Sequence, residues 1–398
     1  MVYLVALLLL MYGVLQYDLQ NYQRGKERLF LLIVFYLICV SGLSYRMGGD
    51  GIGYMMRYNS YTTYDGIGWQ ALTKYDGRMP GWVLLVKLCR FITADYCLFK
   101  IIHAIIINTL ICNAIRRITR YVFSGLLCYF VLLYFDFNFQ ILRQSLSIAL
   151  FIYSLIYFKS KQWYKYYICV IIAFLFHESS AVCALFPIMR YFKATKFSLL
   201  LISGTIFAII FFRNNIITTI LGGVMPEVFA GKFYAYKQEL EESSVFSAFS
   251  NLLLSTIIPL LLCYIHRLET SYSVIRIGAL VYGISYSVGL IVPIFYRFSL
   301  FFIVFFYLLY IELFIDISQK GLSFIKHHTN QSINCFKNNS QRIMYFLLLV
   351  LFIIVKSRFY FTLYGDTNYP SWVQYYPYSS VFFENTDETR ELFFRQLD

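Results

Sequence analysis

Arg46 and Asp50 lie close to four glycines, at positions 48, 49, 51 and 53, in the stretch GLSYRMGGDGIGY, residues 42 to 54, directly after a run of apolar residues. Arginine presents a planar fork of N–H donors that matches the oxygens of a phosphate group. The glycines would let backbone N–H groups approach the same ligand, although an ordinary turn would use them equally well. The stretch lacks the spacing and the preceding strand of a P-loop or a dinucleotide-binding loop. It therefore predicts an anion site of another kind.

Three further ionisable residues lie at the ends of apolar runs: Arg143 in NFQILRQSLSIA, His177 in FLFHESSA and Arg297 in PIFYRFSLFF. Each has a structural explanation alone, because an arginine near a helix end can extend to lipid headgroups and a single histidine usually packs inside the protein. Four such residues at one depth in a membrane would instead favour a shared site. Their placement therefore depends on the segments that carry them.

The composition indicates a membrane protein. Hydrophobic residues make up 59% of the 398 residues and charged residues only 14%, with a mean hydropathy of +0.62. A water-soluble core could not bury so much apolar side chain. The formal charge of +13 is confined largely to short segments between apolar runs, so we expect no nucleic-acid partner. The nine cysteines are scattered singly and show neither disulfide nor metal spacing.

Apolar runs of about 17 to 25 residues, with shorter ones tolerated, can cross a bilayer as helices. The chain contains about twelve such runs, so we expect an all-α polytopic integral membrane protein with a single transmembrane domain over residues 1–398. The predicted spans are residues 2–16, 29–45, 95–115, 121–138, 141–158, 164–177, 179–192, 197–213, 246–265, 275–291, 294–315 and 343–356.

The connecting segments predict which side of the membrane each end faces. Six of them hold 18 of the 34 Lys and Arg but only 3 of the 21 Asp and Glu, so by the positive-inside rule they are cytoplasmic. Residues 80–94 carry Lys87 and Arg90, which favours an amphipathic helix that lies at the outer surface or re-enters it over another span. This topology brings the four ionisable residues to the outer ends of their spans. The predicted outer segments are the loop 46–94, the loop 214–245 and the tail 357–398.

Three stretches match a known family in order along the chain. SGLSYRMGGDGIGY is similar to an Arg-x-Gly-x-Asp-x-x-x-Tyr motif, and YRFSLFFIVFFYLL is similar to a late Tyr-Arg span. Between them, FNFQILRQ and FLFHESSA are similar to an Asn-x-x-x-x-Arg-Gln helix followed by Phe-His-x-Ser-Ala, with Glu178 and extra aromatic residues as departures. Together they resemble the EpsG family of Wzy-type polysaccharide polymerases, which build O-antigen, capsule or exopolysaccharide.

The resemblance implies a glycosyltransferase at the outer face of the bacterial cytoplasmic membrane. It would transfer a glycan chain from undecaprenyl pyrophosphate to the non-reducing end of a lipid-linked repeat unit, which requires cations for the leaving group and a base for the acceptor hydroxyl. Asp50 and His177 are the expected catalytic residues; an aspartate beside arginines stays ionised and suits acceptor orientation, so His177 remains the rival base. Arg143 and Arg297 are expected on the pyrophosphate, and Arg46 is expected to orient Asp50 or contact phosphate. The expected substrate-binding residues are Arg46, Arg143, Arg297, Gln144, Asn138, Glu178 and Tyr54.

The expected partners are an undecaprenyl pyrophosphate-linked oligosaccharide, membrane lipids, a chain-length regulator and a flippase, with no cofactor. No metal is expected either, because no two carboxylates have the spacing of a ligand pair. A lipid-linked oligosaccharide flippase or transporter is an alternative, but it would line its arginines along a transmembrane cavity and show internal repeats, which are not evident. A membrane O-acyltransferase acting on glycan would also use His and Arg, but the glycine-rich stretch with Arg46 and Asp50 has no evident place in one. A purely structural partner of a glycan assembly complex would not need several charges at one depth.

Overall fold

The computed structural model describes residues 1–75, 77–191, 204, 252–266, 274–289, 296–320, 339–364, 367–383 and 387–396. These residues form two compact units, which are treated separately below. The first unit contains Met1–Glu178 and Phe314–Asp398, and the second contains Ser179–Leu313. Three predicted segments lie largely or wholly outside the described residues. They are the span 197–213, of which only residue 204 is described, the outer loop 214–245, and residues 321–338 of the predicted cytoplasmic segment 318–342.

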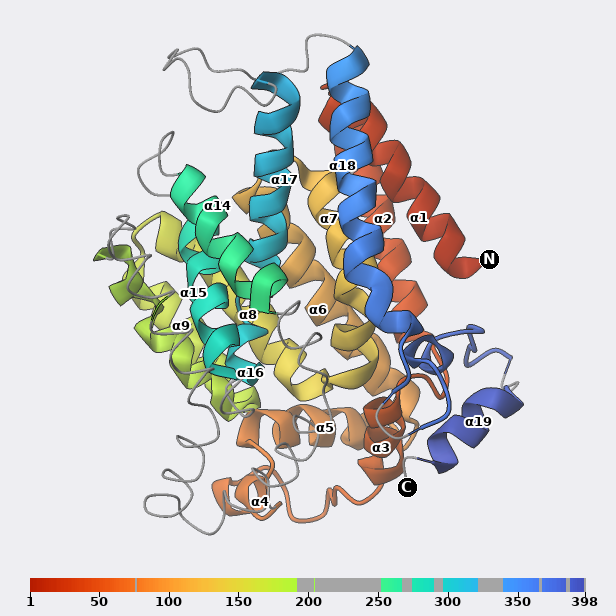
Figure 1. Cartoon of the computed structure of the whole chain (residues 1–398). Coiled ribbons are helices and arrows are strands. Elements are labelled where there is room, and N and C mark those ends of the chain that lie inside the picture. Colours follow the sequence, from red (N-terminus) through yellow and green to blue (C-terminus); the bar gives the residue numbers. More distant parts are fainter. Residues whose placement is uncertain are drawn as a thin grey trace. The chain divides into compact units, whose positions relative to one another are not determined.

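Every regular element in the described part of the first unit is helical (Figure 1). Its elements are α1 (Val2–Gly13), η1 (Val14–Leu19), α2 (Lys26–Gly42), α3 (Gly49–Tyr58), α4 (Trp69–Thr73), α5 (Pro80–Ile92), α6 (Tyr96–Ile118), α7 (Val122–Leu132), η2 (Asp136–Gln140), α8 (Leu142–Lys159), α9 (Trp163–Phe176), α18 (Asn339–Ser357), η6 (Arg358–Phe361), η7 (Ser371–Gln374) and α19 (Glu388–Arg395).

The second unit is helical as well wherever it is described. Two of its helices cross the boundary between the units, since η3 begins at the last residue of the first unit and α17 ends within the first unit. The elements are η3 (Glu178–Tyr191), η4 (Leu253–Ile257), α14 (Ile258–His266), α15 (Val274–Gly289), α16 (Tyr296–Ser299) and α17 (Ile303–Lys320).

The predicted all-helical class is confirmed for the described residues, whereas the count of twelve spans is not. Three helical segments are long and apolar enough to cross a membrane: Val2–Leu19, Tyr96–Ile118 and Asn339–Phe361. They coincide with three predicted spans. The shorter apolar helices among the described residues are Val122–Leu132, Trp163–Phe176, Glu178–Met189, Leu253–Tyr264 and Val274–Gly289.

Helix α6 occupies the middle of the first unit, where it packs against α2 and α8. Its N-terminus is capped by Asp95, whose carboxylate accepts a hydrogen bond from Cys97 N at 2.9 Å. Gly42 favours close approach at the α2 crossing, because a Cβ there would lie 3.2 Å from Ile101 Cα. Helix α6 therefore supports α2 and α8, its two main neighbours in this unit.

A buried hydrogen-bond network joins α6 to the turn before α8. Asn108 Nδ2 donates to Asn138 Oδ1 at 2.9 Å, and Tyr129 Oη donates to Asn108 Oδ1 at 3.0 Å. Asn138 Nδ2 donates in turn to the Tyr134 carbonyl at 2.9 Å. Both asparagine side chains are fully buried, so each group of this network needs its partner to offset the loss of water. The network fixes η2 against α6.

Helices α3, α4 and α5 gather at the end of the bundle where α6 begins, with α19 beside them (Figure 1). The predicted amphipathic segment 80–94 does form a helix, α5, which starts with Pro80 at a position where the missing N–H costs nothing. Its charged side chain Lys87 is buried, however, while Phe91 and Ile92 are exposed. Lys87 can be buried because Asp65 of the preceding loop pairs with it.

Candidate functional site

A cavity of about 680 Å³ opens at the α3 end of the first unit. We call it the arginine cavity, because its lining includes five arginines and only two carboxylates. The arginines come from α3, from the loop just before α5, from α8, from the tail helix α19 and from the turn after α2. They are Arg46, Arg57, Arg78, Arg143 and Arg395, and the acidic residues are Asp50 and Glu391.

The glycines of the 48–53 stretch allow α3 to pack closely on η2. Gly48 has a φ of +76°, and a Cβ there would lie 2.3 Å from the Phe139 carbonyl oxygen. A Cβ on Gly51 would lie 2.6 Å from the same oxygen. Gly53 differs, since it lines the cavity and a Cβ would meet nothing within 4 Å. Close backbone packing therefore explains Gly48 and Gly51.

The backbone amides at the start of α3 are already hydrogen-bonded to protein acceptors. Gly48 N donates to the Gln374 carbonyl and Gly49 N to Gln374 Oε1, both at 3.2 Å. Asp50 N donates to Gln140 Oε1 at 3.0 Å, and the two glutamine side chains are themselves hydrogen-bonded. The expectation that these amides bind the anion is therefore wrong for Gly48 and Gly49. The groups of the cavity that remain for an anion are therefore its arginine side chains.

Arg46 makes a bidentate ion pair with a residue of the C-terminal tail. Its Nε donates to Glu391 Oε1 at 2.9 Å and its Nη2 to Glu391 Oε2 at 2.6 Å. The pair holds the pKa of the Glu391 carboxyl below its usual value and raises the pKa of Arg46. We expected Arg46 to orient Asp50 or to contact phosphate directly. In the structure, Nε and Nη2 of Arg46 both donate to Glu391 instead.

Arg143 enters the cavity from the first turn of α8. Its Nε donates to Tyr54 Oη at 3.2 Å and its Nη1 to the Gly77 carbonyl at 2.8 Å. The guanidinium of Arg78 lies over the same tyrosine ring, 5.9 Å from the centroid. No carboxylate of the described residues lies within 4.0 Å of the Arg143 nitrogens. Arg143 is thus held in place by neutral acceptors while its charge remains available to a ligand.

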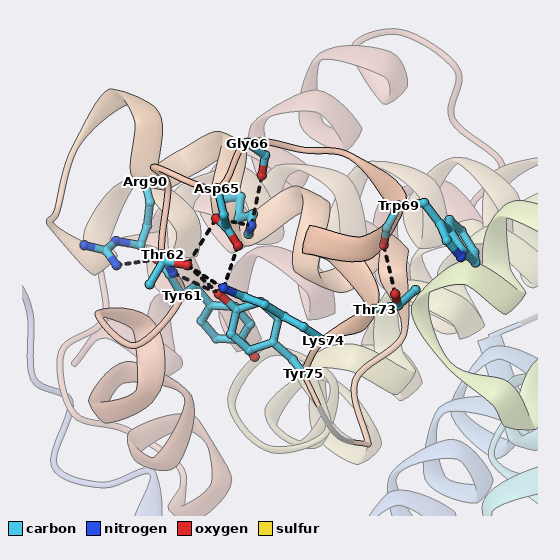
Figure 2. A network of polar contacts seen from close by, with 10 residues as sticks. Tyr61, Thr62, Asp65, Gly66, Trp69, Thr73, Lys74, Tyr75 and Arg90 are labelled. Carbon is cyan, nitrogen blue, oxygen red and sulfur yellow. Dashed lines mark hydrogen bonds and ion pairs between the residues drawn. The ribbon is translucent and has the colours of Figure 1, made fainter.

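The loop that carries Gly77 and Arg78 is anchored by an ionic network (Figure 2). Asp65 Oδ1 accepts from Lys87 Nζ at 2.8 Å, and its Oδ2 pairs with Lys74 Nζ at 2.5 Å. Hydrogen bonds from Lys74 and Lys87 hold the pKa of Asp65 well below its usual range. Lys87 also donates to the Gly66 carbonyl at 2.9 Å. This network ties the loop to α5 and so fixes the position of the neighbours of Arg143.

Four of the nine expected site residues line the arginine cavity: Arg46, Asp50, Tyr54 and Arg143. Asn138 belongs instead to the buried network described above, and Gln144 is buried on α8. Neither lines the cavity formed by the described residues.

The other expected residues lie elsewhere. His177 is 3% exposed at the end of α9, with its Nδ1 at 3.9 Å from Glu178 Oε2. Glu178 is largely exposed. Arg297 lies on α16 in the second unit. The structure therefore describes one part of the expected site in detail and leaves the joint action of all nine residues as a proposal.

Several residues of the cavity were not predicted from the sequence. Arg57 on α3 and Arg78 before α5 belong to no motif of the family resemblance, and Glu391 and Arg395 lie more than 300 residues beyond Arg46 in the sequence. No local signal in the sequence pointed to these four residues. Among the described residues, no group of three His, Cys, Asp or Glu side chains could hold a metal ion.

Comparison with known proteins gives one result that covers most of the chain. The model of the EpsG family matches residues 27–326, which include the whole of α3, α5, α6 and α8. No curated protein and no solved structure matches the chain.

Proposed function

This chain belongs to the EpsG family, and from that premise we propose that it is a polysaccharide repeat-unit polymerase. Membership indicates a membrane protein of polysaccharide biosynthesis, and the apolar helices agree with that class. In our proposal the donor is a glycan chain on undecaprenyl pyrophosphate, and the acceptor is the non-reducing end of a lipid-linked repeat unit. The reaction takes place at the outer face of the bacterial cytoplasmic membrane.

The observation that carries the proposal is the excess of cationic side chains in the arginine cavity. In glycosyl transfer from a lipid pyrophosphate, the bond between the anomeric carbon and the phosphate oxygen breaks. The departing pyrophosphate gains negative charge, and the carbon gains positive charge. Five arginines against two carboxylates provide a preorganised environment for that charge. An arginine fork is better suited to this role than a lysine, because it offers paired donors in a fixed plane.

Arg143 is our principal candidate for contact with the leaving group. Its two hydrogen-bond acceptors, Tyr54 Oη and the Gly77 carbonyl, orient the guanidinium without neutralising it. Arg78 stands over the same tyrosine ring, so a pyrophosphate bound by Arg143 would have a second cation nearby. We assign Arg297 the same kind of role as Arg143, as the sequence resemblance implies.

The bond changes can be written in full. An acceptor hydroxyl oxygen attacks the anomeric carbon of the donor sugar, and the bond from that carbon to the phosphate oxygen breaks. The electron pair of the broken bond stays on undecaprenyl pyrophosphate, while the hydroxyl proton passes to a base. Asp50 is exposed in the arginine cavity and is one candidate, and His177 is the other. Gln144, Asn138, Glu178 and Tyr54 complete the proposed substrate-binding set, although Asn138 acts through the fold because its side chain is buried.

Reconstitution tests this function directly. The purified chain is placed in liposomes with undecaprenyl pyrophosphate-linked repeat units from its source strain, and glycan length is followed by gel electrophoresis. We expect products of increasing length and one released undecaprenyl pyrophosphate for each new bond. Movement of the lipid-linked units across the bilayer without chain growth would show a flippase instead. Neither growth nor movement in the presence of folded protein would favour a structural partner of an assembly complex.

A further inference from the structure

A second cationic cavity of about 730 Å³ lies at the other end of the first unit. We call it the basic cavity. The turn between η1 and α2, the end of α6, the start of α7 and the end of α8 form its walls. Helix α6 links the two sites, because its first residues share a small void with Arg46 and its last residues line the basic cavity. The cationic residues are Lys26, Arg116, Arg117, Arg120 and Lys159, and the acidic residues are Asp18 and Glu27.

The two carboxylates of the basic cavity are already engaged. Glu27 Oε2 pairs with Arg116 Nη1 at 2.5 Å. Asp18 Oδ2 accepts from the backbone N of Ser124 at 2.7 Å and from its hydroxyl at 2.9 Å, which caps the first turn of α7. The five cationic side chains of the basic cavity outnumber its two carboxylates. A ligand with negative charge would relieve the repulsion among these side chains.

Two further groups define the chemistry that fits. Helix α2 begins at this cavity, directly after Gly25, whose φ is +84°, and no side chain caps its first backbone amides. The uncapped N-terminus of a helix favours a phosphate group. Asp18 is 6% exposed, and its Oδ1 has no hydrogen-bond partner among the described residues. That oxygen would accept a hydrogen bond from a hydroxyl or ammonium group. The cavity therefore suits a phosphate ester that also carries a donor.

Aromatic residues place the cavity at the level of lipid headgroups. Tyr17 lines it, and its ring centroid lies 6.4 Å from that of Tyr12 and 6.3 Å from that of Tyr22. Tyr12 and Tyr22 are both exposed. Exposed tyrosines at the end of an apolar membrane helix are typical of the boundary between hydrocarbon and water. A phosphate at this depth belongs most naturally to a phospholipid.

We propose that the basic cavity is a binding site for the headgroup of an anionic phospholipid of the phosphatidylglycerol type. The arginines and Lys26 hold the phosphate, and Asp18 accepts a hydrogen bond from a glycerol hydroxyl. Bound there, the lipid neutralises the cations that α2, α6 and α8 bring together and so stabilises the meeting point of these helices. The site is distinct from the arginine cavity and does not depend on the proposed polymerase activity.

Titration of the delipidated full chain in detergent, followed by native mass spectrometry, tests the proposal. Phosphatidylglycerol is compared with phosphatidylcholine of the same acyl chains, and glycerol phosphate serves as the soluble competitor. We expect phosphatidylglycerol to bind about tenfold or more tightly than phosphatidylcholine. The double variant Arg117→Gln, Arg120→Gln should lose about tenfold in affinity for phosphatidylglycerol.

The matched control is Arg24→Gln, Arg28→Gln, which removes the same charge from exposed residues that do not line the cavity. It should change the affinity by less than about twofold. The variant Arg117→Lys, Arg120→Lys should bind more tightly than the Gln variant, which separates lost charge from misfolding.

Three results would overturn the proposal. Equal losses in the two Gln variants would show diffuse surface attraction rather than a site. Equal affinity for the two lipids would also contradict it. Binding of glycerol phosphate without retention of any lipid would assign the cavity to a soluble phosphate ester.

Discussion

Arg46 and Glu391, which are 345 residues apart in the sequence, form a two-bond ion pair at the rim of the arginine cavity. The side chains are 21% and 25% exposed, so the pair is partly screened by water. It attaches α19 to the turn between α2 and α3. The tail therefore contributes a wall of the cavity and occupies one of its five arginines with a protein carboxylate, which a phosphate group would have to replace at that position.

Glu391→Gln should lower the free energy of unfolding at neutral pH by about 1 kcal/mol or less, because the pair is partly exposed. The pKa of Glu391 is lowered in the folded chain, so its contribution is complete above its unfolded value of about 4.3 and is lost as pH falls through the folded value. The difference in stability between wild type and variant should therefore shrink below about pH 4.3. Thermal unfolding in detergent between pH 7 and pH 3.5 measures it.

Glu388→Gln is the control for this experiment, because Glu388 is exposed on the same turn of α19. It should have little effect at any pH. A Glu391→Gln deficit that persists unchanged at low pH would contradict an ionic origin.

Arg143→Lys should reduce polymer synthesis steeply. Lysine keeps the charge but cannot hold Tyr54 Oη and the Gly77 carbonyl while also presenting a fork to phosphate. The loss of one charge-assisted bond costs about 1.5–3 kcal/mol, which corresponds to a fall in rate of about 10- to 150-fold. Tyr54→Phe should cost less, about 0.5–1.5 kcal/mol. Initial rates with reconstituted protein measure both effects. A wild-type rate for Arg143→Lys would contradict paired hydrogen bonds from Arg143 to the pyrophosphate.

Arg28→Lys is the matched control for Arg143→Lys, since Arg28 is exposed and lines neither cavity. It makes the same change of side chain far from the proposed chemistry. We expect its polymer yield to equal that of the wild type.

Gly48→Ala should destabilise the fold, whereas Gly53→Ala should not. At Gly48 the new Cβ combines a positive φ with a contact of 2.3 Å to the Phe139 carbonyl oxygen, and we expect a loss of about 2 kcal/mol or more. At Gly53 nothing lies within 4 Å, and alanine in a helix should stabilise by up to about 1 kcal/mol. Melting temperatures in detergent compare the two, and similar losses would show that α3 does not pack on η2 as described.

Asp65→Asn should lower the melting temperature more than Lys74→Met. The first change leaves the buried ammonium of Lys87 without its carboxylate, and an unpaired buried charge is strongly unfavourable. The second removes a cation that is 40% exposed. Lys87→Met should be milder than Asp65→Asn, because Asp65 then keeps Lys74. The reverse order of these two variants would refute the role of Asp65 as the counter-charge of Lys87.

The predicted sidedness of the membrane can be tested with two exposed serines. A cysteine at Ser60, in the loop 46–94, should react with an impermeant thiol reagent in intact cells, and one at Ser160, after α8, should not. The parent chain must first have its nine native cysteines replaced. Labelling of Ser160→Cys alone would invert the topology and place the arginine cavity in the cytoplasm.

Local sequence patterns were sufficient to predict several helices and part of the candidate site. The apolar runs predicted the three helical segments that are long enough to cross a membrane, and the charges of residues 80–94 predicted the helix α5. The family motifs singled out Arg46, Asp50, Tyr54 and Arg143. These features depend on residues within a few turns of one another, since helix periodicity, capping and proline geometry are local properties. For the same reason, the sequence alone established the membrane class and the family.

Only the tertiary structure decided which charges meet. No local pattern could pair Arg46 with Glu391, because that contact depends on how the tail docks after the helices have packed. Lys87 is buried because the loop before α5 supplies Asp65, and Asn138, an expected substrate-binding residue, is held by Asn108 of α6. The free energy of a charged or polar side chain depends on neighbours that are remote in sequence, so its role is settled by packing rather than by its own segment.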